Sequence, residues 1–292
     1  MMAIAMPNYL MLFIILTCTS IISLASPFTN NWIQIPSQVQ IEAKNEDRQF
    51  QTFNVTIQNI TVSNGYFWGI DDRASNRFPP GNLVMCARPC TDGDWIDGKG
   101  ALDHIDANSR AIWGTNPSIF RYLYSKPIYA SNTVDFTRFR NFEGCGCSCD
   151  VTVSNNGYVW VLSCVTTIMC NAGGDCLTIP HRISNNLIQI ETDNEEVWAV
   201  DDRYHIFKRP VNGSGEWSSV PGEMRYISAS GNAHVWGIAP NNSLYMCEKP
   251  CSGDWQYVGG SFKQIDGGND IVIGVTTSNT LIAMSLQGMR GI

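Results

Sequence analysis

A short apolar phrase with a tryptophan in its second position recurs along the chain. An aromatic or β-branched residue, a tryptophan, a small residue and an apolar residue follow one another at residues 67–70, 112–115, 159–162, 197–200 and 235–238. A sixth copy, at residues 272–275, has isoleucine in place of tryptophan. The second positions (residues 68, 113, 160, 198, 236 and 273) are separated by 45, 47, 38, 38 and 37 residues. Such a period is typical of proteins that stack one supersecondary unit several times.

A second tryptophan precedes several copies of the phrase. Trp95, Trp217 and Trp255 open three units and Trp32 opens a diverged first segment, so all nine tryptophans occupy one of two repeat positions. In the fifth unit the pattern predicts strands at 215–220, 225–229, 233–238 and 243–247, separated by Pro-Gly, Ser-Gly-Asn and Pro-Asn-Asn turns. No window shows a sustained helical period of apolar residues.

Units of about 40 residues with several short strands cannot bury both faces alone, so they pack radially as blades. The sequence therefore predicts an all-β, six-bladed β-propeller. We expect the N-terminal strand near Trp32 to complete the last blade, because that arrangement hides both exposed sheet edges. We expect the tryptophans of the phrase to fill the space between blades and not to serve as ligand platforms.

The first residues have the pattern of a secretory leader. Residues 9–24 are apolar apart from small hydroxyl residues, and small residues surround Ala25, where cleavage is expected. A membrane anchor would need about 20 apolar residues with charged flanks, and this run is shorter. No other segment is long and apolar enough to span a bilayer. The expected organisation is a signal peptide at residues 1–25 and one propeller domain at residues 26–292, in a secreted, extracellular protein.

Composition narrows the class of partner. The net charge is -7 and the pI is about 5.0, which argues against a nucleic-acid-binding protein because phosphate contacts need a basic surface. Four Asn-x-Ser/Thr sequons are consistent with export. The N-glycosylation candidates are Asn54, Asn59, Asn212 and Asn241.

Residues 217–237, WSSVPGEMRYISASGNAHVWG, resemble a known repeat. They are similar to the tectonin, or tachylectin-1-like, pattern W-x-x-[IV]-x-G-x-[LM]-x-x-I-[SD]-A followed by VWG[VI]-N. The resemblance covers essentially the whole chain after the leader and is strongest in copies two, five and six. It implies a six-bladed propeller that binds carbohydrate or bacterial lipopolysaccharide in defence or in egg provisioning.

The segment CEKPCSGDW, at residues 247–255, resembles molluscan members of that family. It is similar to the lectin-like light subunit of snail-egg perivitellin toxins. That resemblance implies a second chain of the perforin type, linked by a disulfide. The third blade is the most divergent surface, so we expect such a chain to dock there, although the even number of cysteines after the leader weighs against a bridge between chains.

Ten cysteines remain after the leader, which carries Cys18. Two Cys-x₃-Cys pairs occupy the same place in units one and five, and unit four lacks both cysteines together. We therefore expect the local bridges Cys86–Cys90 and Cys247–Cys251, and a metal site is disfavoured because no histidine or second cysteine pair lies nearby. In the third unit, the first three cysteines are expected to pair with the last three, in an order that the sequence leaves open. These six are Cys145, Cys147, Cys149, Cys164, Cys170 and Cys176.

Polar residues repeat in the turn that follows each tryptophan phrase. Such turns on a rigid scaffold are where carbohydrate sites are expected, although the same residue types also simply form turns. Several weak sites around a ring would act by multivalency. The candidates are Asp71, Asp72, Arg73, Asn116, Asp201, Asp202, Arg203, Asn241 and Asn242, with Tyr204 and Tyr245 as stacking faces.

Other functions are less well supported by the sequence. The four histidines are scattered without a metalloprotease or serine-elbow motif, and residues 154–160 only mimic the Asp-box of sialidase propellers. We expect no enzyme activity, no cofactor and no metal site. The alternatives to a lectin are an egg storage or structural protein and a protein-docking platform on the third blade.

Overall fold

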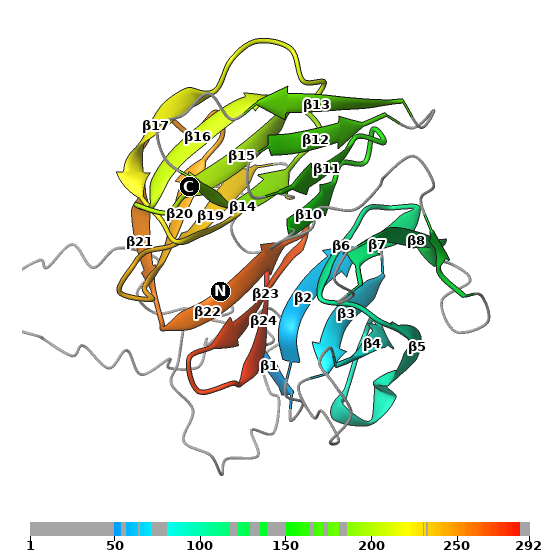
Figure 1. Cartoon of the computed structure of the whole chain (residues 1–292). Coiled ribbons are helices and arrows are strands. Elements are labelled where there is room, and N and C mark those ends of the chain that lie inside the picture. The colour runs from blue at the N-terminus through cyan, green and yellow to red at the C-terminus, as the bar shows by residue number, and fades with distance from the viewer. Residues whose placement is uncertain are drawn as a thin grey trace, which may run out of the picture.

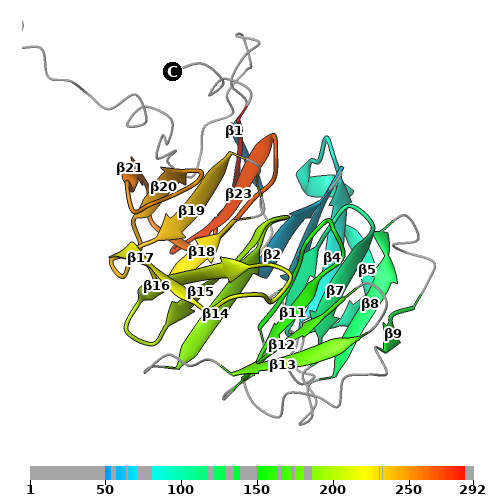
Figure 2. The same ribbon diagram turned by 90° about the horizontal axis from the view of Figure 1, so that it is seen from above.

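The computed structural model describes residues 50–53, 57–63, 65–71, 81–116, 122–128, 135–138, 150–163, 166–171, 175–180, 186–229, 231 and 233–286. These residues form six four-stranded antiparallel sheets. Figures 1 and 2 show the sheets arranged around a common centre. None of the described residues forms a helix long and apolar enough to cross a membrane.

Consecutive stretches of chain build the first five sheets, which we number as blades in chain order. The strands of blade one are β2 (Ile57–Ser63), β3 (Tyr66–Asp71), β4 (Asn82–Ala87) and β5 (Ile96–Ala101), with a 3-10 turn η1 (Asp92–Asp94) before β5. Those of blade two are β6 (His104–Ala107), β7 (Ala111–Thr115), β8 (Leu123–Pro127) and β9 (Thr137–Arg138). Those of blade three are β10 (Asp150–Val153), β11 (Val159–Leu162), β12 (Thr166–Cys170) and β13 (Cys176–Pro180).

Blades four to six are built in the same way. The strands of blade four are β14 (Leu187–Thr192), β15 (Glu196–Asp201), β16 (His205–Pro210) and β17 (Ser218–Glu223). Those of blade five are β18 (Tyr226–Ser228), β19 (His234–Ile238), β20 (Leu244–Glu248) and β21 (Gln256–Gly259). Those of blade six are β22 (Phe262–Gly267), β23 (Ile271–Thr276), β24 (Leu281–Ser285) and, from the start of the chain, β1 (Phe50–Phe53).

In each blade the strand named first above lies nearest the centre of the ring. Strands β2, β6, β10, β14, β18 and β22 each contact the next in that order, and β22 contacts β2. The contacts therefore close a ring, and the predicted six-bladed propeller is confirmed.

An N-terminal strand does close the last blade. Strand β1 pairs antiparallel with β24, with Phe50 opposite Met284 and Phe53 opposite Leu281. The strand expected to do this was the one near Trp32, which lies outside the described residues. The physical reason for the closure is unchanged, because β24 would otherwise present an unpaired edge.

The boundaries of the predicted units are shifted by one strand relative to the blades. The strand that follows Trp217 was expected to open the fifth blade, but it is β17, which pairs with β16 as the outermost strand of blade four. The sequence repeat therefore begins with the outer strand of one blade and continues into the next blade. Each such unit joins two neighbouring blades covalently.

The tryptophans of the phrase belong to the core, as predicted. Trp68, Trp160, Trp198 and Trp236 are at most 1% exposed, whereas Trp113 is half-buried. The glycine after Trp236 permits close packing, because a Cβ at Gly237 would lie 2.7 Å from the Sδ of Met224. The other tryptophan position, represented by Trp95, Trp217 and Trp255, packs partly buried against three separate hydrophobic clusters.

Three disulfides lie within the described residues. Cys86–Cys90 and Cys247–Cys251 are bonded as predicted. Cys170 bonds to Cys176, so the expectation that each would pair with one of the three earlier cysteines is wrong. The two are opposite each other across β12 and β13, where the register alone brings them together. Cys145, Cys147, Cys149 and Cys164 lie outside the described residues.

Candidate functional site

The predicted carbohydrate-binding turns of blades four and five share one backbone geometry with the turn at the same place in blade six. In each turn the fourth residue donates its amide to the carbonyl of the first, at 2.8–3.0 Å. That fourth residue has a left-handed backbone, with φ of 69° at Tyr204, 71° at Asn242 and 64° at Asn279. The sequence repeat is therefore also a repeat of turn conformation.

These turns also hold the start of the next blade. The carbonyl of Tyr204 accepts a hydrogen bond from the amide of Met224, and the carbonyl of Asn242 accepts one from the amide of Phe262, both at 2.9 Å. The turn backbone thus has a structural role, and only side chains that point outward are available to a ligand.

Asp201 is one of the residues that build the turn. Its carboxylate is fully buried and accepts hydrogen bonds from the amides of Arg203 and His205 at 2.9 and 2.8 Å. The Nδ1 atom of His205 lies 2.9 Å from the second carboxylate oxygen. Asp201 therefore acts as a scaffold for the exposed residues that follow it.

Two other candidates have the same supporting role. The side-chain oxygen of Asn116 accepts a hydrogen bond from the amide of Tyr122 at 2.9 Å, and that of Asn241 accepts one from the amide of Ser243 at 3.0 Å. Asp71 is the last residue of β3 and half-buried. Asp72 and Arg73 lie outside the described residues.

Tyr204 differs from its counterparts in the other turns. It is 37% exposed and holds the left-handed conformation that asparagine holds in blades five and six. A bulky side chain rarely adopts this conformation, and backbone outliers of this kind concentrate at binding sites. Asp202 and Arg203 beside it are exposed. Burial lowers the pKa of the Arg225 guanidinium, on which the Tyr204 hydroxyl also acts electrostatically.

Tyr245 does not present a free ring face of this kind. It is half-buried in β20, packs against the cluster that contains Trp198 and meets the ring of Tyr257 edge-on at 5.5 Å between centroids. Tyr257, which the sequence analysis did not single out, is the more exposed of the two at 49%.

A ring of polar side chains around the central axis escaped the sequence analysis. In each blade one residue of the inner strand lies directly opposite the second residue of the repeated phrase, for example Asp106 opposite Trp113. These inner-strand residues are all buried. They are Thr61, Asp106, Thr152, Glu191, Ser228 and Asp266.

Asp106 connects three blades through this ring. Its carboxylate accepts hydrogen bonds at 3.0 Å from the hydroxyls of Thr61 in blade one and Thr152 in blade three. It also accepts the amides of Ala107 and Val153 at 2.7 and 2.6 Å. Burial, and then the nearby charge of Asp266, raise the pKa of Asp106 to about 7.

The same environment acts on Glu191. Burial and the surrounding carboxylates of the ring raise its pKa well above the usual range. Its Oε1 atom has no hydrogen-bond partner among the described residues. No three of the described His, Cys, Asp and Glu side chains are placed to hold a metal ion. The ring is therefore a buried hydrogen-bonded network that couples the inner strands.

The candidate glycosylation sites lie in different settings. Asn212 and Asn241 are exposed in turns. Asn59 lies on the inner strand β2, half-buried, with its side-chain oxygen 3.4 Å from the donating amide of Ile105. Asn54 lies outside the described residues. Glycosylation at these sites remains a prediction.

The closed ring of four-stranded sheets defines the chain as a six-bladed β-propeller. Solved propellers show the same fold. A superposition on YCF48 from Cyanidioschyzon merolae gives a TM-score of 0.55 at 11% identity, over 80% of this chain and 83% of that one. Human WBSCR16 gives 0.53 at 8% identity, over 79% and 76%. The WD40 propeller domain of Doa1 gives 0.51 at 12% identity, over 84% and 99%.

The family model for the tectonin domain matches residues 186–289, which span blades four to six. Together with the six-bladed ring, this match supports a tectonin-like β-propeller. No curated protein sequence matches it significantly.

Proposed function

We propose that this protein is a secreted lectin that recognises cell-surface glycans or lipopolysaccharide through the turns on the rim of the ring. The observation that carries the proposal is Tyr204, an exposed aromatic ring in a strained turn. Asp202 and Arg203 beside it supply an acceptor and a donor for sugar hydroxyls. The turn is held in place by the buried carboxylate of Asp201, so the site is formed before a ligand arrives. The function needs no catalytic group.

Binding to a glycan array, with two matched glycine variants, tests this proposal. Tyr204→Gly removes the ring and suits the left-handed backbone, and Asn279→Gly makes the same backbone change at a turn with no ring to lose. An aromatic contact contributes about 0.5–1.5 kcal/mol, so Tyr204→Gly should weaken binding roughly two- to tenfold at that site. Asn279→Gly and Tyr204→Phe should bind like the wild type. Equal binding by Tyr204→Gly and the wild type contradicts the proposal.

A role as the targeting subunit of a pore-forming toxin is the finer form of this proposal. It requires a disulfide to a perforin-type chain, and the six cysteines within the described residues are all paired with each other. The link would therefore use one of the third-blade cysteines outside the described residues. Native protein run on a gel with and without reductant tests this: a second chain that separates only on reduction supports the toxin role, and a single band in both lanes contradicts it.

A further inference from the structure

A hollow lies at the end of the propeller axis that is opposite to the predicted rim site. Its volume is about 440 Å³, within the usual range for small-ligand pockets. In blade four, Asp201 pairs with Leu187 at the start of β14, whereas Asp193 in the wall of the hollow follows the end of that strand. The two regions are therefore separated by the length of the inner strand, about 17 Å.

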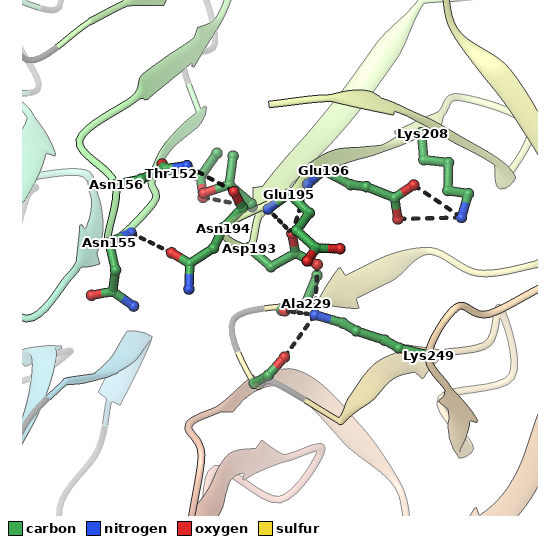
Figure 3. A network of polar contacts seen from close by, with 12 residues as sticks. Thr152, Asn155, Asn156, Asp193, Asn194, Glu195, Glu196, Lys208, Ala229 and Lys249 are labelled. Atoms are coloured by element: carbon green, nitrogen blue, oxygen red, sulfur yellow. Dashed lines mark hydrogen bonds and ion pairs between the residues drawn. The ribbon is translucent and has the colours of Figure 1, made fainter. Parts of the chain in front are cut away.

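Turns from five blades form the wall of this hollow, and several of their polar groups are unused. The Oδ1 atom of Asn155 accepts a hydrogen bond from the backbone amide of Ser109 at 2.8 Å. The backbone amide of Asn155 donates a hydrogen bond to Asn194 Oδ1 at 3.1 Å. Its side chain points away from Asn194 (Figure 3). The Asn155 Nδ2, the Ser109 hydroxyl and the Asn269 side chain make no hydrogen bond to another described residue. Hydroxyl and amide groups are therefore available to a ligand.

The charged groups at this mouth are already paired. Arg88 of blade one contacts both carboxylate oxygens of Asp270 in blade six, at 3.2 and 2.8 Å. The Nζ of Lys249 lies 2.5 Å from Asp193, whose other oxygen accepts two backbone amides of its own turn (Figure 3). A ligand with a net charge would find no uncompensated partner here, so the wall favours an uncharged polar ligand.

The floor of the hollow is mostly apolar. Val62, Ala107 and Val153 line it, each placed directly after the polar ring residue of its inner strand, and Thr192 holds the same place in blade four. An apolar floor under a hydroxyl- and amide-bearing wall matches a molecule with one hydrocarbon face and a rim of hydroxyls. A pyranose ring has this distribution of polar and apolar atoms.

We infer that the axial hollow binds a terminal residue of a neutral carbohydrate. The pyranose lies with its C–H face on the three apolar side chains and its hydroxyls toward Ser109, Asn155 and Asn269. This site is independent of the rim site around Tyr204, because the two open on opposite faces and share no residue. Either site can exist without the other.

Titration of ¹⁵N-labelled protein with methyl glycosides locates such a site. The probes are the methyl glycosides of glucose, galactose, mannose and N-acetylglucosamine at millimolar concentration, with methyl glucuronide as the charged comparison. At least one neutral glycoside should shift the amides of Ser109, Asn155 and Asn269, and the glucuronide should bind more weakly than the glucoside. Tyr204→Gly should leave these shifts unchanged, which separates failure of the rim site from failure of this one.

Two adjacent asparagines give a matched pair of variants. Asn155 and Asn156 both contact Asn194 of the next blade, but only Asn155 lines the hollow. Asn155→Ala should weaken glycoside binding about two- to tenfold, as expected for one lost hydrogen bond, and Asn156→Ala should not. Thermal denaturation shows whether each variant is folded. The inference is overturned if no neutral glycoside shifts these amides, if the glucuronide binds best, or if both variants lose affinity equally.

Discussion

Replacing Asp106 by asparagine tests whether the axial ring makes the propeller more stable in mild acid. The pKa of Asp106 is about 7 in the folded protein, against about 3.9 for an aspartate in an unfolded chain. A raised carboxyl pKa means that the folded state holds the proton more tightly, so its contribution to stability is full below pH 4 and is lost as the pH rises through 7. Burial is the main cause, and like charge from Asp266 adds to it.

The expected size of the effect follows from these two pKa values. One pKa unit corresponds to about 1.4 kcal/mol. Ionisation of the Asp106 carboxyl therefore lowers the free energy of unfolding by about 4 kcal/mol at pH 7 and by about 2 kcal/mol at pH 5. The wild type should therefore gain about 2 kcal/mol between pH 7 and pH 5 from this residue alone. Glu191, whose pKa is also raised, acts in the same direction. Asp270, whose pKa is lowered by its hydrogen bonds from Arg88, loses its contribution only at more acidic pH.

Asparagine removes this titration but fits the site imperfectly. The carboxylate accepts two backbone amides and two threonine hydroxyls, and the hydroxyls can reverse to accept from an amide group. One backbone amide then loses its acceptor, at a cost of about 1–3 kcal/mol. At pH 7 this cost is offset because the variant no longer buries a destabilising negative charge. At pH 5 that gain is smaller, so the variant should be no more stable than the wild type.

Thermal denaturation at pH 5, 6 and 7 measures the difference. For a chain of this size 1 kcal/mol corresponds to about 2–4 °C, so the wild-type midpoint should rise by roughly 4–8 °C on going from pH 7 to pH 5. In Asp106→Asn most of this rise should be absent. In Asp254→Asn, an exposed control, the rise should equal that of the wild type. A wild-type midpoint that stays flat or falls toward pH 5, or an Asp106→Asn variant that keeps the full rise, refutes the reasoning.

Three further predictions concern the scaffold. Cys247→Ala with Cys251→Ala should lower stability by about 2 kcal/mol, because the loop that the bond closes is short; an unchanged thermal midpoint would contradict this. Gly237→Ala should lower the free energy of unfolding by about 1–3 kcal/mol, since the added methyl group would overlap Met224. Urea denaturation measures this change, and a neutral effect would show that the blades can separate slightly. Deleting Phe50–Phe53 should expose β24, so its amides should exchange hydrogen faster than those of blade four, and equal protection would argue against closure by β1.

The period of the tryptophan phrase was enough to predict the fold. A strand that packs against a neighbouring blade needs a large apolar side chain at the same place in every copy, so Trp68, Trp160, Trp198 and Trp236 mark their blades in the sequence. The boundary of the unit could not be predicted as well. A repeat has no natural start, and only the hydrogen-bond register shows that the strand after Trp217 pairs with β16.

The polar ring left a signal that the sequence analysis did not use. In five copies a polar residue lies between two apolar or small residues on the inner strand, at residues 60–62, 105–107, 151–153, 227–229 and 265–267. In a strand buried on both sides, such a residue must find a partner, and here it finds one in the next blade. A single sequence does not show which partner, because Thr61 and Asp106 are 45 positions apart.

The sequence marks the candidate turns but does not separate the roles of their residues, and ligand binding by these turns stays a prediction. Turn-forming side chains and ligand-binding side chains are of the same chemical types, so Asp201 and Asp202 look equivalent in the sequence. In the structure the first is buried and holds the turn, while the second is exposed. The axial hollow could not be predicted, since its wall combines turns from five blades and no single repeat contains it.

The pairing of β1 with β24 sets an order of events during synthesis. Phe50 and its partner Met284 are 234 positions apart (284 minus 50), which takes the ribosome roughly 10–50 s to translate at 5–20 residues per second. Until then the first strand has no partner, and the blades already made form an open arc. A chain that ends prematurely before β24 would keep that unpaired edge permanently, so truncated chains that lack only the last strands should be among the most aggregation-prone products of this gene.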